Sequence, residues 1–272
     1  MKEITPPIEN SFVYSCSSEE KWGYDQFVPD HILAFQVSGE THVFNQKGTF
    51  VLKKNRMLLA HRNQFAKSLK LPADDKEYKA VSVIFKTEDL KKYAALHSIN
   101  IHKKYEGKLT AVIQPDVFLQ SYFQSLIPYL ENPEKSTNNM SFAKVSECIE
   151  LLLNYDCGLR DFLFDFSEPH KINLAEFMQK NFHYNAPIEN FARLTGRSLA
   201  AFKRDFVHIF NTSPAKWLKN KRLEEAHELI HKKNKKSADI YLDLGFENLS
   251  HFYTAFKQKY GVTPTESLTL QK

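Results

Sequence analysis

Residues 202–217 read FKRDFVHIFNTSPAKW, and residues 252–267 repeat the same pattern as FYTAFKQKYGVTPTES. At an offset of fifty positions the following pairs coincide: Phe202/Phe252, Phe206/Phe256, Phe210/Tyr260, Ser213/Thr263 and Pro214/Pro264. Rings at four-residue steps lie on one face of an α-helix, so each stretch predicts a helix with a buried aromatic face. The chain therefore contains one small helical unit twice.

Each copy predicts two helices joined by a turn. In the first copy an apolar helix ends at Leu194, Gly196 breaks it, and Ser198 is the expected N-cap of the second helix. In the second copy Gly245 makes the break and Asn248 is the expected cap. An exposed second helix with cationic side chains suits the major groove of DNA, which admits one helix and presents base edges to it. The repeat therefore indicates two helix-turn-helix units that can read adjacent turns of one duplex, separated by a long helix, PAKWLKNKRLEEAHELI.

The net charge of +5 is unevenly distributed along the chain. Residues 170–272 hold 17 Lys and Arg against 10 Asp and Glu, so the half that contains the repeat carries all of the positive excess. This asymmetry is expected when one domain meets a polyanion and the other does not. A basic face that is merely solvated gives the same balance, so charge alone leaves both readings open.

The N-terminal half has the pattern of a β domain. From His31 to about Phe85, turn residues separate the expected strands HILAFQVSGE, THVFNQ, GTFVLKK, MLLAHR and KAVSVIFK. Short, closely spaced runs rich in β-branched and aromatic residues predict an antiparallel sandwich or barrel. The expected fold class is therefore α+β, with an antiparallel β-barrel, then linker helices, then an all-α domain with two helix-turn-helix motifs.

Two stretches after the β region have helical spacing, PDVFLQSYFQSLIPYLEN and SFAKVSECIELLLNY. The second aligns Val145, Ile149 and Leu152 on one stripe whose steps of three and four positions fit a seam between two helices. We expect these three residues to contribute to a homodimer contact, because dimerisation raises the effective concentration of modest DNA binders. The alternative is that the stripe packs on the β domain of its own chain.

Residues from about 173 to 268 resemble the DNA-binding domain of the AraC/XylS family of bacterial transcription regulators. The resemblance rests on FARLTGRS…FKRDF, on SPAKWLKNKRLEEAHELI and above all on DIYLDLGFENLSHFYTAFKQKYGVTP, which follows the family signature around the second helix-turn-helix. The N-terminal half is similar to the family's cupin-like regulatory β-barrel through its strand spacing and through VSGETHVFN…GTFVLKKNRMLLAHRNQ. The whole chain looks closest to the ExsA-like branch, whose regulatory domains answer to partner proteins rather than to sugars.

The helix pattern and the resemblance together imply which side chains meet DNA. The expected base-reading residues are Leu199, Ala200, Lys203, Arg204, Leu249, Ser250, His251 and Thr254. The expected phosphate contacts are Ser198, Asn248, Lys257, Lys233 and Lys235. The run HKKNKK at 231–236, which holds the last two, is alternatively a plain solvated loop. Arg204 is the expected guanine contact, because a guanidinium can donate two hydrogen bonds to O6 and N7.

The sequence holds no pattern typical of catalysis or of cofactor binding. His31, His42 and His61 stand singly, without the HxH and carboxylate cluster from which a catalytic cupin builds a metal site. No Gly-rich phosphate loop and no Ser-His-Asp or Cys-His arrangement stands out. We therefore expect no enzyme activity, no metal and no cofactor. The aromatic residues of the strands either fill a closed barrel or line a ligand pocket.

The cysteines and the hydropathy indicate the compartment. Cys16, Cys148 and Cys157 are odd in number and lack a CxxC spacing, which fits a reducing cytosol. No apolar run approaches the ~18 residues typical of a membrane span, so we expect a cytoplasmic protein without a membrane partner.

These observations predict a sequence-specific transcription regulator of the activating kind. Its expected partners are double-stranded DNA, RNA polymerase, a second copy of the chain and a small-molecule or protein effector sensed by the regulatory domain. The expected domains are a regulatory β domain at 1–115, a helical linker at 116–166 and a DNA-binding domain at 167–272. Two alternatives belong to other classes: a cupin-type enzyme and a protein-binding adaptor, each with an appended helical module.

Overall fold

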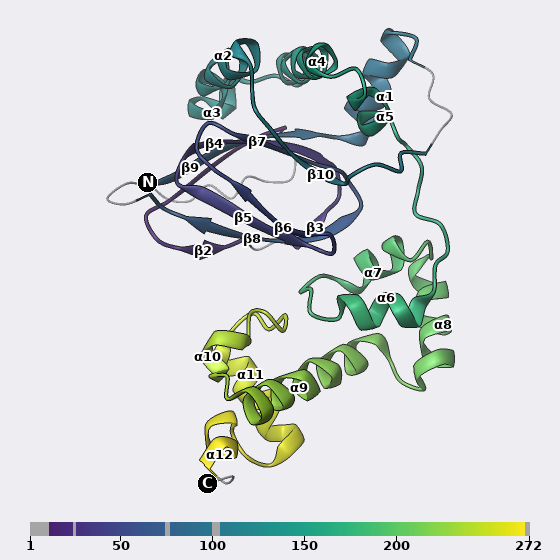
Figure 1. Cartoon of the computed structure of the whole chain (residues 1–272). Helices are drawn as coiled ribbons and strands as arrows, with labels where there is room; N and C mark the ends of the chain where they lie inside the picture. The colour runs from purple at the N-terminus through teal and green to yellow at the C-terminus, as the bar shows by residue number, and fades with distance from the viewer. Residues whose placement is uncertain (1–10, 24–25, 74–76, 100–103, 270–272) are drawn as a thin grey trace. The chain divides into compact units, whose positions relative to one another are not determined.

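The computed structural model describes residues 11–23, 26–73, 77–99 and 104–269, and it divides into two compact units. The first unit is Met1–Ser167 and the second is Glu168–Lys272. Figure 1 shows the strands confined to the first unit and only helices in the second. The α+β class predicted from the sequence is confirmed. The strands and the helices that follow residue 115 form one compact unit. The expected boundary between a regulatory part and a linker near residue 115 therefore stays a prediction.

The first unit is built on antiparallel strands. Their bounds are β1 (Phe12–Ser17), β2 (Lys21–Trp22), β3 (Phe27–Val28), β4 (His31–Ser38), β5 (Glu40–Asn45), β6 (Gly48–Leu52), β7 (Met57–Ala60), β8 (Gln64–Leu71), β9 (Tyr78–Phe85) and β10 (Thr110–Ile113). One sheet has the order β1-β9-β4-β7-β10, and the other has the order β2-β8-β5-β6 with β3 also on β8. Among the described residues no strand pairing joins the two sheets, so the expected barrel is instead a pair of open, cupin-like sheets.

The first sheet is held at its centre by apolar residues in register. Leu33 of β4 lies opposite Val83 of β9 on one side and opposite Leu59 of β7 on the other. All three side chains are fully buried. Because side chains alternate between the two faces of a strand, a one-residue slip would expose all of them, so this layer fixes the register.

Helices cover this sheet. Their bounds are α1 (Thr87–Leu96), α2 (Val117–Ser125), α3 (Ile127–Glu131), the 3₁₀ turn η1 (Pro133–Lys135), α4 (Asn138–Tyr155) and α5 (Leu159–Leu163). Asp116 caps α2 and Thr137 caps α4, each by accepting a hydrogen bond from the third residue of its helix. One core cluster joins the helices to the sheet, and it contains Leu119 and Phe123 of α2 as well as Leu33 and Met57 of the sheet. The two helical stretches predicted after the β region are confirmed.

The stripe on α4 corrects the expected dimer contact. Val145, Ile149 and Leu152 have no exposed surface and belong to the core cluster of the first unit. Side chains covered within one chain cannot form the surface that meets a second copy. The alternative prediction, packing on the β domain of the same chain, is what the structure shows, because the sheet offers an apolar face that needs a cover.

The second unit consists of short helices around one long one. Their bounds are α6 (Leu174–Asn181), α7 (Ile188–Leu194), α8 (Leu199–Phe210), α9 (Pro214–Lys233), α10 (Ser237–Ile240), α11 (Leu249–Tyr260) and α12 (Pro264–Thr269). The pairs α7/α8 and α10/α11 form the two predicted helix-turn-helix units, and α9 is the predicted helix between them. Thr263 and Glu266 form the capping box of α12, with hydrogen bonds in both directions. None of the helices in the described ranges combines the length and apolar character needed to cross a bilayer.

Candidate nucleic-acid interface

The second helix of the first helix-turn-helix, α8, is anchored by its aromatic face. Ser198 caps it, with the N–H of Ala201 donating to Ser198 Oγ at 3.3 Å. Phe202 and Phe206 have no exposed surface. The ring of Phe206 lies against Trp217 of α9, with centroids 5.7 Å apart. The four-residue spacing of the rings therefore does what the sequence predicted, since it turns the opposite face of α8 outward.

The turn before α8 is fixed by close backbone contacts. Gly196 has a φ of +63°, and a Cβ at this position would lie 2.2 Å from the carbonyl carbon of His170. Only glycine tolerates both the left-handed backbone and this approach. The turn of the first helix-turn-helix therefore rests directly on the segment with which the second unit of the chain begins.

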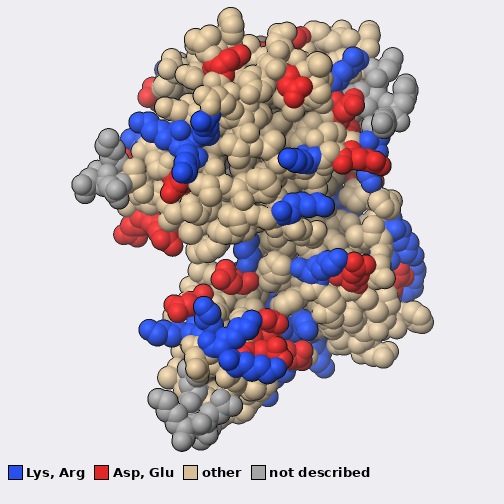
Figure 2. All heavy atoms as spheres, in the orientation of Figure 1, with Lys and Arg blue, Asp and Glu red and all other residues tan. Residues whose placement is uncertain are grey.

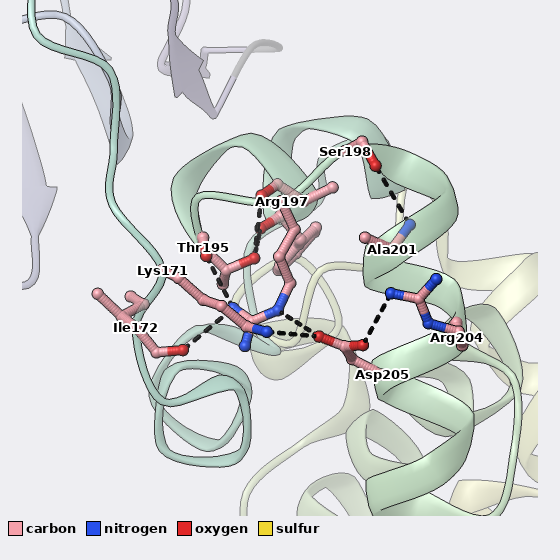
Figure 3. Close-up of polar contacts among 10 residues, drawn as sticks. Lys171, Ile172, Thr195, Arg197, Ser198, Ala201, Arg204 and Asp205 are labelled. Carbon is pink, nitrogen blue, oxygen red and sulfur yellow. Dashed lines mark hydrogen bonds and ion pairs between the residues drawn. The ribbon is translucent and has the colours of Figure 1, made fainter.

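Arg197 in the same turn holds three parts of the unit together (Figure 3). Its Nη1 donates to the carbonyl oxygens of Thr195 at 2.7 Å and Ile172 at 3.0 Å, and its Nε donates to Asp205 Oδ2 at 3.1 Å. The hydrogen bond from Arg197 is the main cause that lowers the pKa of Asp205. Asp205 belongs to α8, so this carboxylate ties the orientation of the helix to the turn. Sequence reasoning missed Arg197, because its three partners lie at separate places in the chain.

The outer face of α8 presents the expected cations. Ala200, Lys203 and Arg204 are exposed, whereas Leu199 is only partly exposed. The side chain of Arg204 is 77% exposed, and its Nη2 lies 3.6 Å from Asp205 Oδ1. Figure 3 shows this ion pair at the outer side of α8. A surface pair of this kind contributes little to stability, so the guanidinium is free to exchange its partner.

A shallow groove of about 530 Å³ adjoins this face. It is lined by Lys171, Arg197, Arg204, Asp205, His208 and Ile209. Lys171 and His208 were not among the predicted contacts. The signal that could have found His208 is its place one helical turn after Arg204 on the same exposed face.

The second helix-turn-helix repeats the construction with different outer residues. Asn248 caps α11, its Oδ1 accepting from the N–H of His251 at 2.7 Å. Phe252 and Phe256 are fully buried, as their counterparts are in the first unit. Of the residues predicted to lie on the outside, Leu249 is only partly exposed. The other predicted residues are exposed: Ser250, His251, Thr254 and Lys257.

The remaining predicted phosphate contacts lie at two kinds of place. Ser198 and Asn248 stand at helix N-termini, where free N–H groups and the helix dipole favour a phosphate. Lys233 is the last residue of α9 and Lys235 follows it, both exposed. On the face of the second unit drawn in Figure 2, Lys and Arg are interleaved with Asp and Glu. On that face the basic side chains therefore do not form one continuous patch.

Two histidines that stand singly in the sequence meet in the fold of the first unit. The rings of His31 and His61 have centroids 4.4 Å apart, and both contact Phe162 of α5. Their Nε2 atoms have no hydrogen-bond partner within the described part of the chain. In that same part, His, Cys, Asp and Glu form no group of three or more that could hold a metal ion. Sequence reasoning missed the pair because β4 and the segment after β7 meet only through the sheet.

This histidine pair predicts acid sensitivity of the first unit. Burial lowers the pKa of His31 well below its usual value, with His61 and Arg62 adding to the shift, and burial also lowers the pKa of His61. The unfolded chain therefore binds these protons more readily, so stability is full above about pH 6.5 and is lost as the pH falls below that value. In a Trp217→Phe background, urea midpoints followed by the fluorescence of Trp22 should fall between about pH 7 and 5.

The variant His31→Asn tests this assignment. An asparagine oxygen can still accept the hydrogen bond that the N–H of Arg62 donates to His31 Nδ1 at 3.2 Å. The variant should flatten the pH dependence, whereas His42→Asn in the same unit should leave it in place. An unchanged slope in His31→Asn would assign the acid sensitivity to other groups.

The fold and the two exposed, capped helices define a two-unit protein with a β domain and paired helix-turn-helix motifs. A family model described as a helix-turn-helix domain matches residues 191–269, and one described as the ExsA N-terminal regulatory domain matches residues 31–158. The chain belongs to the AraC family of helix-turn-helix regulators, and its first unit carries the ExsA type of regulatory domain. The resemblance inferred from the sequence is thereby confirmed.

Known relatives match mainly in part. ExsA of Pseudomonas aeruginosa, an HTH-type transcriptional regulator, is 29% identical over 109 residues, which are 40% of this chain and 39% of that protein. VirF of Yersinia enterocolitica, a virulence regulon transcriptional activator, is 30% identical over 94 residues, 35% of each protein. The matched segments thus span about two fifths or less of these relatives. The solved structure of apo ToxT from Vibrio cholerae has 12% identity and a TM-score of 0.46, and covers 97% of this chain and 99% of that chain.

Proposed function

We propose that this chain is a sequence-specific transcription regulator that binds double-stranded DNA through both helix-turn-helix units. The observation that carries the proposal is the repeated arrangement of a buried aromatic face and an exposed, capped outer face on α8 and α11. Lys233, Lys235 and Lys257, together with the helix N-termini capped by Ser198 and Asn248, supply affinity for phosphates. The outer side chains read base edges. The base-reading and phosphate residues named above are part of this proposal.

The finer assignment is an activator controlled through the first unit. The relatives named as a regulator and an activator support this direction, as does the match of residues 31–158 to a regulatory domain. We propose RNA polymerase, a second copy of the chain, and a small-molecule or protein effector as partners, in the cytoplasm. The protein has no catalytic activity or cofactor in this proposal. The homodimer contact is not formed by the α4 stripe, whose side chains are buried.

Selection of bound fragments from random DNA by the full chain tests the proposal. We expect enrichment of a motif with two parts, because two recognition helices reach separate major-groove segments. Adding cell extract to a parallel selection reports whether an effector changes the affinity. The absence of any enriched motif would overturn the proposal and leave the adaptor as the better reading, whereas a stoichiometric metal in the purified protein would favour the cupin-type enzyme.

The same DNA fragment gives a salt dependence that counts phosphate contacts. If the three lysines assigned to phosphates, Lys233, Lys235 and Lys257, all neutralise them, the slope of log K against log salt is about −2.7. Affinity should then fall roughly 40-fold between about 50 and 200 mM salt. A salt-independent affinity would contradict this mechanism.

The double variant Lys233→Gln/Lys235→Gln separates the two readings of the loop after α9. If these lysines contact phosphates, the slope should become shallower by about 2. If the loop is merely solvated, the slope should equal that of the wild type. A matched control is Lys47→Gln/Lys53→Gln, which removes two exposed lysines from the first unit.

A further inference from the structure

A partly buried arginine near the middle of α9 joins the turn of the second helix-turn-helix to the loop that enters the first. The Nε of Arg222 donates to the carbonyl oxygen of Phe182 at 2.8 Å, and one Nη donates to that of Tyr184 at 2.8 Å. Its other Nη donates to the carbonyl oxygen of Gly245 at 3.0 Å. Phe182 and Tyr184 lie between α6 and α7, just before the first helix-turn-helix, and Gly245 is the turn of the second. We call this arrangement the Arg222 clamp.

The guanidinium is well suited to this place. Burial lowers the pKa of Arg222 to about 10, so the side chain stays charged at neutral pH. A guanidinium offers five donors in a rigid, planar fork, and charge-assisted hydrogen bonds to carbonyl oxygens are stronger than neutral ones. Lysine has three donors on one atom and cannot reach three separated carbonyls in the same geometry. The clamp therefore requires arginine in particular.

At the clamp, the turn of the second helix-turn-helix closely approaches the loop between α6 and α7. Gly245 has a φ of +83°, and a Cβ there would lie 2.7 Å from the carbonyl oxygen of His183 and 3.0 Å from Cζ of Arg222. A second link lies beside it, where Asn185 Nδ2 donates to Glu247 Oε1 at 3.4 Å. The turn of the second helix-turn-helix is thus seated against the chain that enters the first.

The two ends of α9 each hold one unit. Trp217 near its start packs against Phe210 of α8, with ring centroids 4.8 Å apart and the rings tilted. Leu223 and Ile230 further along share a core with Phe252 of α11. Packing of this kind attaches each helix-turn-helix to α9. Rotation of one helix-turn-helix about α9 is resisted directly by the contacts of the Arg222 clamp.

We propose that Arg222 is a positioning residue that fixes the angle between the two recognition helices, so that the protein takes a two-part DNA site with one preferred spacing. This inference rests on the proposed function, since it concerns how two DNA-reading units act together. Each base pair inserted between the half-sites moves one of them by ~3.4 Å along the duplex and turns it around the axis. A rigid pair of units loses one half-site when the spacing changes, whereas units that turn freely follow it.

The experiment compares affinities of the full chain for DNA carrying the selected half-sites at the native spacing and at spacings changed by one or two base pairs. Each half-site alone is measured as well. The variants are Arg222→Met, which keeps much of the side-chain length without donors, and Arg222→Lys, which keeps the charge. The matched control is Lys216→Met, which removes one positive charge from an exposed position of the same helix.

The wild type and the control should prefer the native spacing by at least about tenfold. Both Arg222 variants should bind each single half-site within about twofold of the wild type and lose most of the spacing preference. An Arg222→Met protein that keeps the wild-type spacing profile would overturn the proposal. If that variant does not fold, Arg222→Lys decides by the same measurement, because a broadened profile supports the clamp and an unchanged one refutes it. Failure of the proposed function is a separate result, in which the wild type itself selects no motif.

Discussion

Reversing the charge of Lys203 and Arg204 together should reduce specific DNA affinity by at least about 100-fold while the fold stays intact. Both side chains are exposed on α8, and the contact of Arg204 with Asp205 lies at the surface. A bidentate guanine contact alone contributes about 1–3 kcal/mol, which corresponds to roughly 5- to 150-fold in affinity. In Lys203→Glu/Arg204→Glu two carboxylates also repel the phosphates that the cations attracted. Electrophoretic or fluorescence titration of the selected fragment measures the loss, and circular dichroism checks the fold.

The matched control for this variant is Lys53→Glu/Lys54→Glu. It reverses two adjacent, exposed lysines in the first unit and so makes the same change in net charge. The control should bind the selected fragment within a fewfold of the wild type, because the charges lie outside the proposed interface. If the α8 variant binds DNA as tightly as the control, the first helix-turn-helix does not read DNA. An adaptor that binds proteins through other surfaces would show this tolerance.

The two recognition helices are expected to contribute unequally. At the fifty-residue offset, Ser250 and Thr254 of α11 stand where Ala200 and Arg204 stand on α8. The hydroxyl of Thr254 donates to the carbonyl oxygen of Ser250 at 3.0 Å, so it is engaged with its own helix. The second unit therefore offers weaker hydrogen-bond donors to base edges. Its role in binding depends more on being held at the correct place, which is what the Arg222 clamp provides.

Local patterns sufficed to predict the helical half. The ring spacing of Phe202 and Phe206 determines which face of α8 is buried, and Ser198 and Asn248 cap the helices they were expected to cap. These are interactions within a few positions of the chain, so sequence spacing specifies them directly. The contacts that orient the units, such as Arg197 to Ile172 and Arg222 to Tyr184, join residues 25 and 38 positions apart. No local pattern encodes such partners.

The β half was predicted in part for the same reason. Strands β4 to β7 and β9 follow runs that were recognised, but β8 was missed, since Lys67 and Lys70 interrupt its apolar pattern. Whether strands close into a barrel depends on which edge strands pair. Such pairs can be distant in the sequence, as β1 and β9 are, and no local pattern predicts them. The apolar stripe of α4 was visible, yet a stripe has the same spacing whether it meets its own sheet or a second chain. Only the position of that sheet decides between them.

Truncating Phe206 to alanine should lower the free energy of unfolding of the second unit by about 3–5 kcal/mol. The side chain has no exposed surface, and its ring lies between Phe202, at a centroid distance of 5.6 Å, and Phe210, at 4.4 Å. Removing it leaves a cavity in a core that is small, because a helix-turn-helix buries few residues. Domains are stable by only about 5–15 kcal/mol, so this loss is a large fraction of the total.

The neighbouring position provides the control that makes this prediction specific. Val207 is 50% exposed on the same helix, so Val207→Ala should change the free energy of unfolding by less than about 0.5 kcal/mol. In a Trp22→Phe background the remaining tryptophan, Trp217, lies 5.7 Å from the ring of Phe206 and reports urea unfolding at that core. A Phe206→Ala protein as stable as Val207→Ala would mean that the aromatic face is not the buried one. The prediction that Lys203 and Arg204 lie on the outward face would then be wrong as well, because a helix that buries one face exposes the opposite one.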